Sequence, residues 1–393
     1  MLLRDYSLLA APDQDDVALA MLCQVLFWAS VALLFHTFLG YQLLIGMLGG
    51  MCRRRAKPAG KAEEQGIAVV IVARNEAERI GARIRNLLAT PGRLEVVVCS
   101  DGSTDGTAAE ARAAGARVFD FATQRGKAAC LSEVVPGLEA PIVVFTDCRQ
   151  EFTPETIPRL ARHLADPAIG AVSGILRIGD PRTSTGEGVD IYWRMETAIR
   201  KAESDYDSCV GCTGAVYAVR RELFHPIPPD TILDDVVIPM KIAMTGHRVV
   251  YDSEAEAYDP QPLDPEAETR RKTRTLAGNF QMLFRHPGWL LPWRNRLAWQ
   301  LISHKYLRLA GPALLACALV SNIWLAGRPF YQPCLAGQVL LYALAAAGIA
   351  LPGLRLLIFS IPAGFVFLNV MTVRGLYRYV LGGTSGGWER ADS

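Results

Sequence analysis

Residues 67–76 read IAVVIVARNE, an apolar and largely β-branched run that stops at Asn75 and Glu76. The pattern recurs in LEVVVCSD (residues 94–101) and in IVVFTD (residues 142–147), and each of these runs ends at an aspartate. Stretches with the apolar spacing of helices separate the three runs. This alternation predicts βαβαβ units with parallel strands and right-handed crossovers, so the expected fold class is α/β.

Glu76, Asp101 and Asp147 are expected to line one crevice, because the carboxyl ends of parallel strands meet at the edge of the sheet where ligands bind. Carboxylates in such a crevice suit the imide and hydroxyls of a nucleoside, and they suit a metal ion that neutralises phosphate. A local explanation stays open for Glu76, since acids in the first turn of a helix also stabilise the helix dipole.

The segment DGSTDGT (residues 101–107) follows the second run. Its glycines allow turns that a side chain would block. Ser103 or Thr104 is expected to cap a helix that carries residues 108–114. A purely local role for Asp101 in this turn is the alternative to ligand binding.

The chain has 393 residues and a formal net charge of +2, which argues against a general affinity for nucleic acid. Residues 17–50 contain no Lys, Arg, Asp or Glu. This run exceeds the roughly 20 residues that span a bilayer. It is too long for a cleavable signal peptide, and acidic residues precede it, so we expect an uncleaved anchor.

Five basic residues follow the anchor: Arg53, Arg54, Arg55, Lys57 and Lys61. Only Arg4 precedes it. The positive-inside rule therefore places the N-terminus outside and the residues after 53 in the cytoplasm.

The expected organisation has seven parts. They are a short extracytoplasmic N-terminus (1–16), a transmembrane anchor (17–50), a basic spacer (51–65), a cytoplasmic catalytic domain (66–285), an interfacial amphipathic segment with Trp289, Trp293 and Trp299 (286–303), a transmembrane bundle of about three segments (304–380) and a tail (381–393). The nine cysteines are scattered, and Cys209 and Cys212 form a single CxxC without a second pair, so we expect buried thiols rather than a zinc site.

Two further sites concern charge at helix starts. Lys127 follows a glycine before an apolar helix and is a candidate phosphate or base contact, with a solvated surface lysine as the alternative. Asp234 and Asp235 are adjacent, and their repulsion can raise one pKa and produce a usable base. Helix capping is the alternative for this pair.

Gly211 and Gly214 would let an extended acceptor approach the backbone, although a tight turn explains them equally well. Arg271 and Arg274 are three residues apart and share a face if this segment is helical. They could hold a pyrophosphate by bidentate contacts or bind anionic lipid headgroups.

Together, these motifs make residues 67–290 resemble glycosyltransferase family 2, the inverting nucleotide-sugar enzymes of the A-type fold. The resemblance rests on the order of residues 69–76, 100–107, 126–127, 147, 211–223 and 234–235. It implies a Rossmann-like, mainly parallel sheet. The anchor and the C-terminal apolar segments resemble the polysaccharide-synthase branch of the family.

The resemblance also implies roles for single residues. Asn75, Glu76 and Asp101 would bind the nucleoside, most often uridine, and Lys127 would lie near the nucleotide. Asp147 matches the first acid of the DxD metal motif. The remaining matches are Asp235 to the catalytic base, Asp234 to the acid before it, Arg274 to the arginine of QxxRW beside the pyrophosphate, and Gly211 and Gly214 to the acceptor side.

The chain departs from the family pattern at three positions. Arg149 replaces the second DxD acid, and Arg271 and Thr275 replace the Gln and Trp of QxxRW. Mg²⁺ or Mn²⁺ would then be held by Asp147 and the diphosphate, or the added cations at Arg149 and Arg271 would offset the diphosphate charge directly. The missing Trp normally frames the acceptor sugar in processive synthases.

The expected function is a membrane-bound inverting glycosyltransferase that moves a sugar from a nucleotide-diphospho-sugar, most often a UDP-sugar, to a glycan or polyprenyl-linked acceptor. The expected setting is cell-surface or exopolysaccharide synthesis at the bacterial inner (plasma) membrane, among membrane lipids and with export or biosynthetic partner proteins. A degenerate transferase that acts as a membrane nucleotide sensor or scaffold is the alternative.

Overall fold

The structure is a computed structural model that describes residues 14–54, 56, 66–178, 191–260, 265–351 and 356–382. The predicted N-terminus (1–16), spacer (51–65) and tail (381–393) lie mostly outside these residues. The chain divides into two compact units. One unit comprises Met1–Leu39 and Leu307–Val373, and the other comprises Gly40–Tyr306 and Arg374–Ser393.

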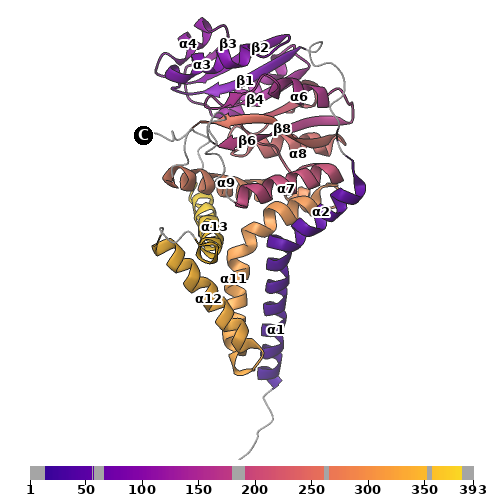
Figure 1. The fold of residues 1–393 in the computed structure, drawn as a ribbon, viewed down its shortest axis with the longest axis vertical. Helices are drawn as coiled ribbons and strands as arrows, with labels where there is room; N and C mark the ends of the chain where they lie inside the picture. The colour runs from indigo at the N-terminus through magenta and orange to yellow at the C-terminus, as the bar shows by residue number, and fades with distance from the viewer. Residues whose placement is uncertain are drawn as a thin grey trace, which may run out of the picture. The chain divides into compact units, whose positions relative to one another are not determined.

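The second unit contains one mixed sheet of eight strands in the order β3-β2-β1-β4-β7-β6-β8-β5 (Figure 1). The strands are β1 (Ile67–Ala73), β2 (Leu94–Asp101), β3 (Arg117–Phe121), β4 (Ile142–Thr146), β5 (Glu151–Phe152), β6 (Ile169–Ile178), β7 (Tyr217–Arg220) and β8 (Arg248–Asp259). β1 to β4 are parallel, and β6 is parallel to β8. β7 runs antiparallel to both of its neighbours and β5 antiparallel to β8. The prediction of an α/β fold with a mainly parallel sheet is confirmed.

β1 is buried along its whole length, which suits a central strand covered on both faces. Ile67, Val69 and Ile71 belong to one apolar cluster together with Ile80 and Ile84 of α3 (Ala77–Leu88). The alternate β1 residues point to the opposite face, where α5 packs against β1 and β2. The sheet core therefore fixes the ends of β1, β2 and β4, which carry the predicted acids.

The other helices of this unit are α2 (Tyr41–Cys52), α4 (Thr107–Ala113), α5 (Lys127–Val134), α6 (Thr156–His163), α7 (Ile191–Tyr206), α8 (Asp234–Met244), α9 (Pro265–Arg285) and α10 (Ala298–Leu301). Short 3-10 turns cover Val135–Gly137, Arg221–Leu223 and Pro287–Leu290, and a π-helical turn covers Ile302–Tyr306. β7 begins at Tyr217, and the 3-10 turn Arg221–Leu223 follows it directly.

α2 and α7 lie side by side (Figure 1). Gly49 permits this contact, because a Cβ atom at this position would lie 2.6 Å from the carbonyl oxygen of Ala202. In the predicted interfacial segment, Trp289 is buried and Trp299 packs against Tyr41, while Trp293 is 76% exposed. Two of the three tryptophans thus pack inside this unit.

The first unit contains α1 (Gln14–Phe35), α11 (Leu307–Trp324), a 3-10 turn (Leu325–Gly327), α12 (Tyr331–Ala350) and most of α13 (Leu357–Val380). A π-helical turn (His36–Gly40) follows α1. The apolar core of the first unit consists of Phe27, Ala318, Leu325 and Tyr331. Within the part of the chain that the structure describes, four helical segments are long and apolar enough to cross a membrane: Asp15–Cys52, Ala298–Gly327, Tyr331–Ala350 and Leu357–Val380.

Gly174 in β6 provides a test of how tightly the sheet is packed. A Cβ atom there would lie 2.4 Å from the carbonyl oxygen of Ala255 and 2.8 Å from a methyl carbon of Val216. We expect Gly174→Ala to lower the free energy of unfolding by about 1–3 kcal/mol, since the backbone has to shift. Thermal unfolding in detergent measures this. Gly137→Ala is the control, because no heavy atom lies within 4 Å of its Cβ position; equal melting of the two variants would contradict the expected strain.

Candidate active site

The turns after β1 and β2 are joined by hydrogen bonds. Asn75 has a left-handed φ of 55°. Its side-chain oxygen accepts the backbone N–H of Thr104 at 2.8 Å, and its own N–H donates to Ser103 Oγ at 3.2 Å. The Glu76 N–H donates to Thr107 Oγ1 at 2.8 Å. The two predicted nucleoside-binding turns therefore form one rim.

The prediction that Ser103 or Thr104 caps the next helix is wrong. α4 begins at Thr107 after Gly106, and the Thr107 N–H donates to the carboxylate of Asp105 at 3.0 Å. Ser103 and Thr104 instead bind the turn that contains Asn75, as described above. Contacts between turns 28 and 29 residues apart decided their partners.

Asp101 ends β2 and is fully buried. Its two carboxylate oxygens accept the backbone N–H groups of Arg125 at 2.6 Å and Gly126 at 2.9 Å. Gly102, with φ of 63°, brings this turn against the same loop, since a Cβ there would lie 2.4 Å from the Gln124 nitrogen. In this structure Asp101 holds the loop that presents Lys127.

Lys127 begins α5 and extends to the acids that follow β4 and begin α8. Its Nζ donates to Asp147 Oδ1 at 2.9 Å and lies 3.6 Å from Asp234 Oδ2. The side chain is only 12% exposed, so the alternative of a solvated surface lysine is wrong. Burial would lower the pKa of Lys127, but the charges of Asp147 and Asp234 raise it above its usual value. We call Lys127, Asp147, Asp234 and Asp235 the charged cluster.

Asp234 and Asp235 form the first turn of α8, and no side chain caps this helix. Asp234 is 6% exposed, and its Oδ2 has no hydrogen-bond partner. Asp235 is half-buried. Burial and the charge of Asp234 raise the pKa of Asp235 to about 6, against the opposing charges of Lys127 and Arg200. This carboxyl therefore titrates close to neutral pH.

The two predicted acceptor-side glycines lie against the start of α8. Gly211 has φ of 88°, so it does form the tight turn that was its alternative explanation, and it packs on Val236. A Cβ at Gly214 would lie 2.9 Å from Asp235 Oδ2. Gly214 thus leaves the Asp235 carboxylate free of an adjacent side chain.

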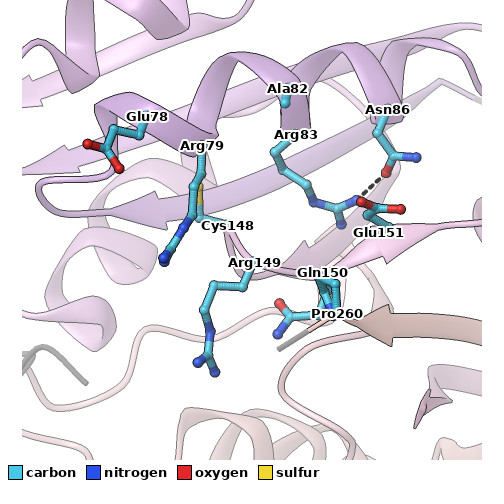
Figure 2. Close-up of a pocket in the computed structure, with 10 residues that line it drawn as sticks. All are labelled: Glu78, Arg79, Ala82, Arg83, Asn86, Cys148, Arg149, Gln150, Glu151 and Pro260. Atoms are coloured by element: carbon cyan, nitrogen blue, oxygen red, sulfur yellow. Dashed lines mark hydrogen bonds between the residues drawn. The ribbon is translucent and has the colours of Figure 1, made fainter. Parts of the chain in front are cut away.

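A hollow of ≈ 460 Å³, lined by Cys148 and Arg149 among others, is drawn in Figure 2. Its lining comes from α3, the β4–β5 connection and the end of β8. Arg79 of α3 and Arg149 of the β4–β5 connection are among its lining side chains (Figure 2). Arg149, in the position of the second DxD acid, lies 3.5 Å from Asp259. Arg83 lies deeper, where it donates to Thr146 Oγ1 at 2.8 Å and burial lowers its pKa to about 9.

Arg271 and Arg274 belong to α9 and are not among the four residues of the charged cluster. Arg271 is exposed and Arg274 is half-buried. Arg200 and Tyr217, by contrast, were not predicted. The charge of Arg200 acts on Asp235. Tyr217 is fully buried and its hydroxyl has no hydrogen-bond partner, and burial and the charge of Asp234 raise its pKa. A polar group near the end of an apolar strand was the one available sequence signal for Tyr217.

Nothing in the described ranges gathers three or more His, Cys, Asp or Glu side chains in a way that could hold a metal ion. Asp147 offers one hard carboxylate, and its side chain is 27% exposed. Such a donor fits Mg²⁺ or Mn²⁺ when phosphate oxygens and water complete the coordination. The CxxC thiols of Cys209 and Cys212 are buried and free, and burial raises the pKa of each.

The chain is similar to known proteins in both sequence and fold. The model of a family described as "Glycosyl transferase family 2" matches residues 68–227. A dolichyl-phosphate hexose transferase of Haloferax volcanii is 31% identical over 164 residues, which are 41% of this chain and 69% of that protein. A poly-beta-1,6-N-acetyl-D-glucosamine synthase of Staphylococcus aureus is 23% identical over 235 residues, which are 57% of each protein. The chain thus spans little more than half the length of that synthase.

Among solved structures, a mannosyltransferase of Pyrobaculum calidifontis in complex with GDP-Man and Mn2+ has a similar fold, with a TM-score of 0.66. The identity is 21%, and the match covers 91% of this chain and 99% of the other. The fold, the ordered acids and the transferase relatives lead to one conclusion: the chain belongs to glycosyltransferase family 2 and is a glycosyltransferase.

Proposed function

We propose that this glycosyltransferase is membrane-bound and inverting, and that it moves a sugar from a nucleotide-diphospho-sugar, most often a UDP-sugar, to a hydroxyl of a glycan or polyprenyl-linked acceptor. The observation that carries the proposal is the half-buried carboxyl of Asp235, whose pKa is raised to about 6, beside the Lys127–Asp147 pair. A general base works best when its pKa lies near the operating pH.

In the proposed step, Asp235 takes the proton from the acceptor hydroxyl as its oxygen attacks the anomeric carbon. The bond from that carbon to the diphosphate breaks on the opposite face, so the configuration inverts and the nucleoside diphosphate leaves with the electron pair. Asp234 acts through its charge, which keeps the pKa of Asp235 high. Gly214 leaves room for the acceptor next to Asp235.

The donor would bind along the rim formed by the turns after β1 and β2. Asn75 and Glu76 belong to this rim, and Asp101 supports it by holding the loop before Lys127. Fixed cations stabilise charge that develops on a leaving group. Lys127 is the buried cation nearest the acids, and Arg271 and Arg274 of α9 are the candidates for the outer side of the diphosphate.

A divalent ion would be held by Asp147 together with diphosphate oxygens. When bound, it would supply Lewis-acid stabilisation of the leaving diphosphate. Arg149, two residues after Asp147 in the chain, lines the hollow drawn in Figure 2 and would add a positive charge there.

Four apolar helices suit an enzyme that stays at a membrane, where lipid-linked acceptors are found. A dolichyl-phosphate acceptor is named for one relative and a polysaccharide product for another, so the two support a lipid-linked and a glycan acceptor, respectively. Cell-surface or exopolysaccharide synthesis at the cytoplasmic face of a bacterial inner membrane fits both. Export proteins would then be partners.

The direct test is incubation of the purified protein with a panel of nucleotide sugars and membrane lipids, with and without Mn²⁺, followed by mass analysis of the extracted glycolipid. A sugar added to a lipid or glycan from one nucleotide sugar supports the proposal. Absence of any transfer across the full panel, with bound nucleotide detected, would favour a nucleotide-binding scaffold instead.

Asp235→Asn should reduce turnover by at least about 100-fold, because the substitution removes the proposed base but keeps the shape of the side chain. Nucleotide binding, measured by calorimetry, should stay near that of the parent. Asp120→Asn, which changes an exposed acid on β3, is the matched control. Full turnover by Asp235→Asn would show that another group is the base.

The same substitution should also stabilise the protein at alkaline pH. The folded-state pKa of about 6 exceeds the unfolded value of about 3.9, so the folded state binds the proton more tightly and stability falls as the pH rises between these values. Asp235→Asn should therefore melt at a higher temperature than the parent at pH 8. The difference should shrink as the pH falls from 8 toward 4, and a difference that does not change with pH would contradict the raised pKa.

Asp147→Asn tests the proposed metal ligand. We expect Mn²⁺ binding in the presence of UDP, measured by electron paramagnetic resonance, to weaken by at least about tenfold. Without UDP, binding should already be weak in the parent, because the protein offers a single carboxylate. Unchanged Mn²⁺ binding in Asp147→Asn would instead favour direct neutralisation of the diphosphate by Lys127 and Arg149.

A further inference from the structure

One face of α7 carries three charged residues that the proposed mechanism does not use. Glu196, Arg200 and Glu203 are spaced by four and three residues and so lie on the same side of the helix. Glu196 is 7% exposed and Glu203 is fully buried, while the Arg200 side chain is 18% exposed. Buried charges are costly unless they are paired, so this face requires compensating partners.

His304 provides the central partner. It is fully buried, and its Nδ1 lies 2.9 Å from Glu203 Oε1 and its Nε2 3.0 Å from Glu196 Oε1. Each ring nitrogen of His304 therefore lies within hydrogen-bond distance of a different carboxylate of α7. Glu203 also accepts the Tyr41 hydroxyl at 2.6 Å and the Val210 N–H at 3.2 Å.

Two cations also contact Glu196. Lys305 Nζ lies 3.4 Å and Arg200 Nε 3.5 Å from its Oε1. Glu196, Arg200, Glu203, His304 and Lys305 thus form one connected group in a buried setting, where screening by solvent is weak.

Arg200 connects this group to the charged cluster. Its Nη1 donates to Thr213 Oγ1 at 2.8 Å. Thr213 is fixed further, because its hydroxyl donates to the Gly174 carbonyl at 2.8 Å and its N–H to Ser173 Oγ at 2.9 Å. The next residue is Gly214, which lies directly against the Asp235 carboxylate.

The other end of the same loop is tied to Asp235 as well. The Cys212 N–H donates to the Asp235 carbonyl oxygen at 2.8 Å, and the Cys209 thiol donates to the Arg200 carbonyl at 3.2 Å. Arg200 and Asp235 are therefore joined through both the backbone and the side chains of residues 209–214. Four charged groups act on Asp235 here: Asp234, Lys127, Arg200 and Lys305.

We propose that Arg200 is a positioning residue for Asp235: it fixes Thr213 and Gly214 against the carboxylate and holds a buried positive charge nearby. Glu196 and His304 keep Arg200 in place from the other side. The inference rests on the proposed function of Asp235 as the base. According to this inference, the protonation of Asp235 depends on Glu196 and Arg200 of α7 and on His304.

The test is the pH dependence of kcat at saturating donor. Turnover of the parent should rise with pH through about 6, as Asp235 loses its proton. Arg200→Met removes a positive neighbour, which favours the protonated carboxyl, so the acidic limb should move up by about 0.5–1 pH unit. Arg200→Lys keeps the charge and should return most of this shift.

Glu196→Gln provides a second arm with the opposite sign. It removes a negative charge beside Arg200 with little change in shape, so the acidic limb should move to lower pH. If Arg200 and Glu196 only stabilised the fold, both variants would lower kcat, but the acidic limb of the pH profile would not move in opposite directions. If Arg200→Met does not fold, Glu196→Gln alone tests the inference. An acidic limb of Glu196→Gln that stays at the pH of the parent or moves to higher pH would then overturn it.

Arg159→Met is the matched control, because Arg159 is also largely buried (23% exposed) and paired with carboxylates, but on α6. It should reduce stability and leave the limb where it is. An Arg200→Met limb equal to that of Arg159→Met overturns the inference. Asp235→Asn, measured in parallel, separates the two proposals. Full turnover of Asp235→Asn would show that Asp235 is not the base. If Asp235→Asn loses turnover but Arg200→Met leaves the acidic limb of the pH profile in place, only the positioning role of Arg200 is overturned.

Discussion

The charged cluster depends on one ammonium group. Lys127 Nζ lies between Asp147, which follows β4, and Asp234, which begins α8. Without this cation, the carboxylates of Asp147 and Asp234 would lose the positive charge that they share, which would favour their protonated forms. The Asp101 carboxylate holds the loop that ends in Gly126, and this loop sets where Lys127 starts. Asp101, at the end of β2, therefore sets the position of Lys127, which in turn contacts Asp147 after β4 and Asp234 at the start of α8.

The sequence predicted the strands well because each is a buried apolar run that ends in a polar residue, and parallel pairing brings such ends together. Asp147 was selected for the same reason, whereas Asp234 and Asp235 were selected as adjacent acids at the start of a helix. The sequence misjudged Ser103 and Thr104, since capping is a local rule and these side chains bind the Asn75 turn across the sheet edge. Partners so distant in the chain leave no local signal.

The group around His304 shows a different limit of the sequence. The spacing of Glu196, Arg200 and Glu203 is visible in the sequence, but a charged helix face usually indicates exposure to solvent. Here the same spacing faces a buried histidine 101 and 108 residues further along the chain. Charges at helical spacing followed by a lone histidine in an apolar segment are weak signals separately, and only tertiary contacts combine them.

Buried charge in this enzyme follows a consistent logic. Asp235 is costly to keep ionised, since burial and Asp234 both oppose its charge, and that cost is what brings its pKa near neutrality. A fully compensated Asp235 would be a weaker base, and an uncompensated one would stay protonated at neutral pH. The intermediate value requires cations that are close but not in direct contact. Lys127 donates its hydrogen bond to Asp147, and Arg200 donates to Thr213. Both cations therefore act on Asp235 through their charge.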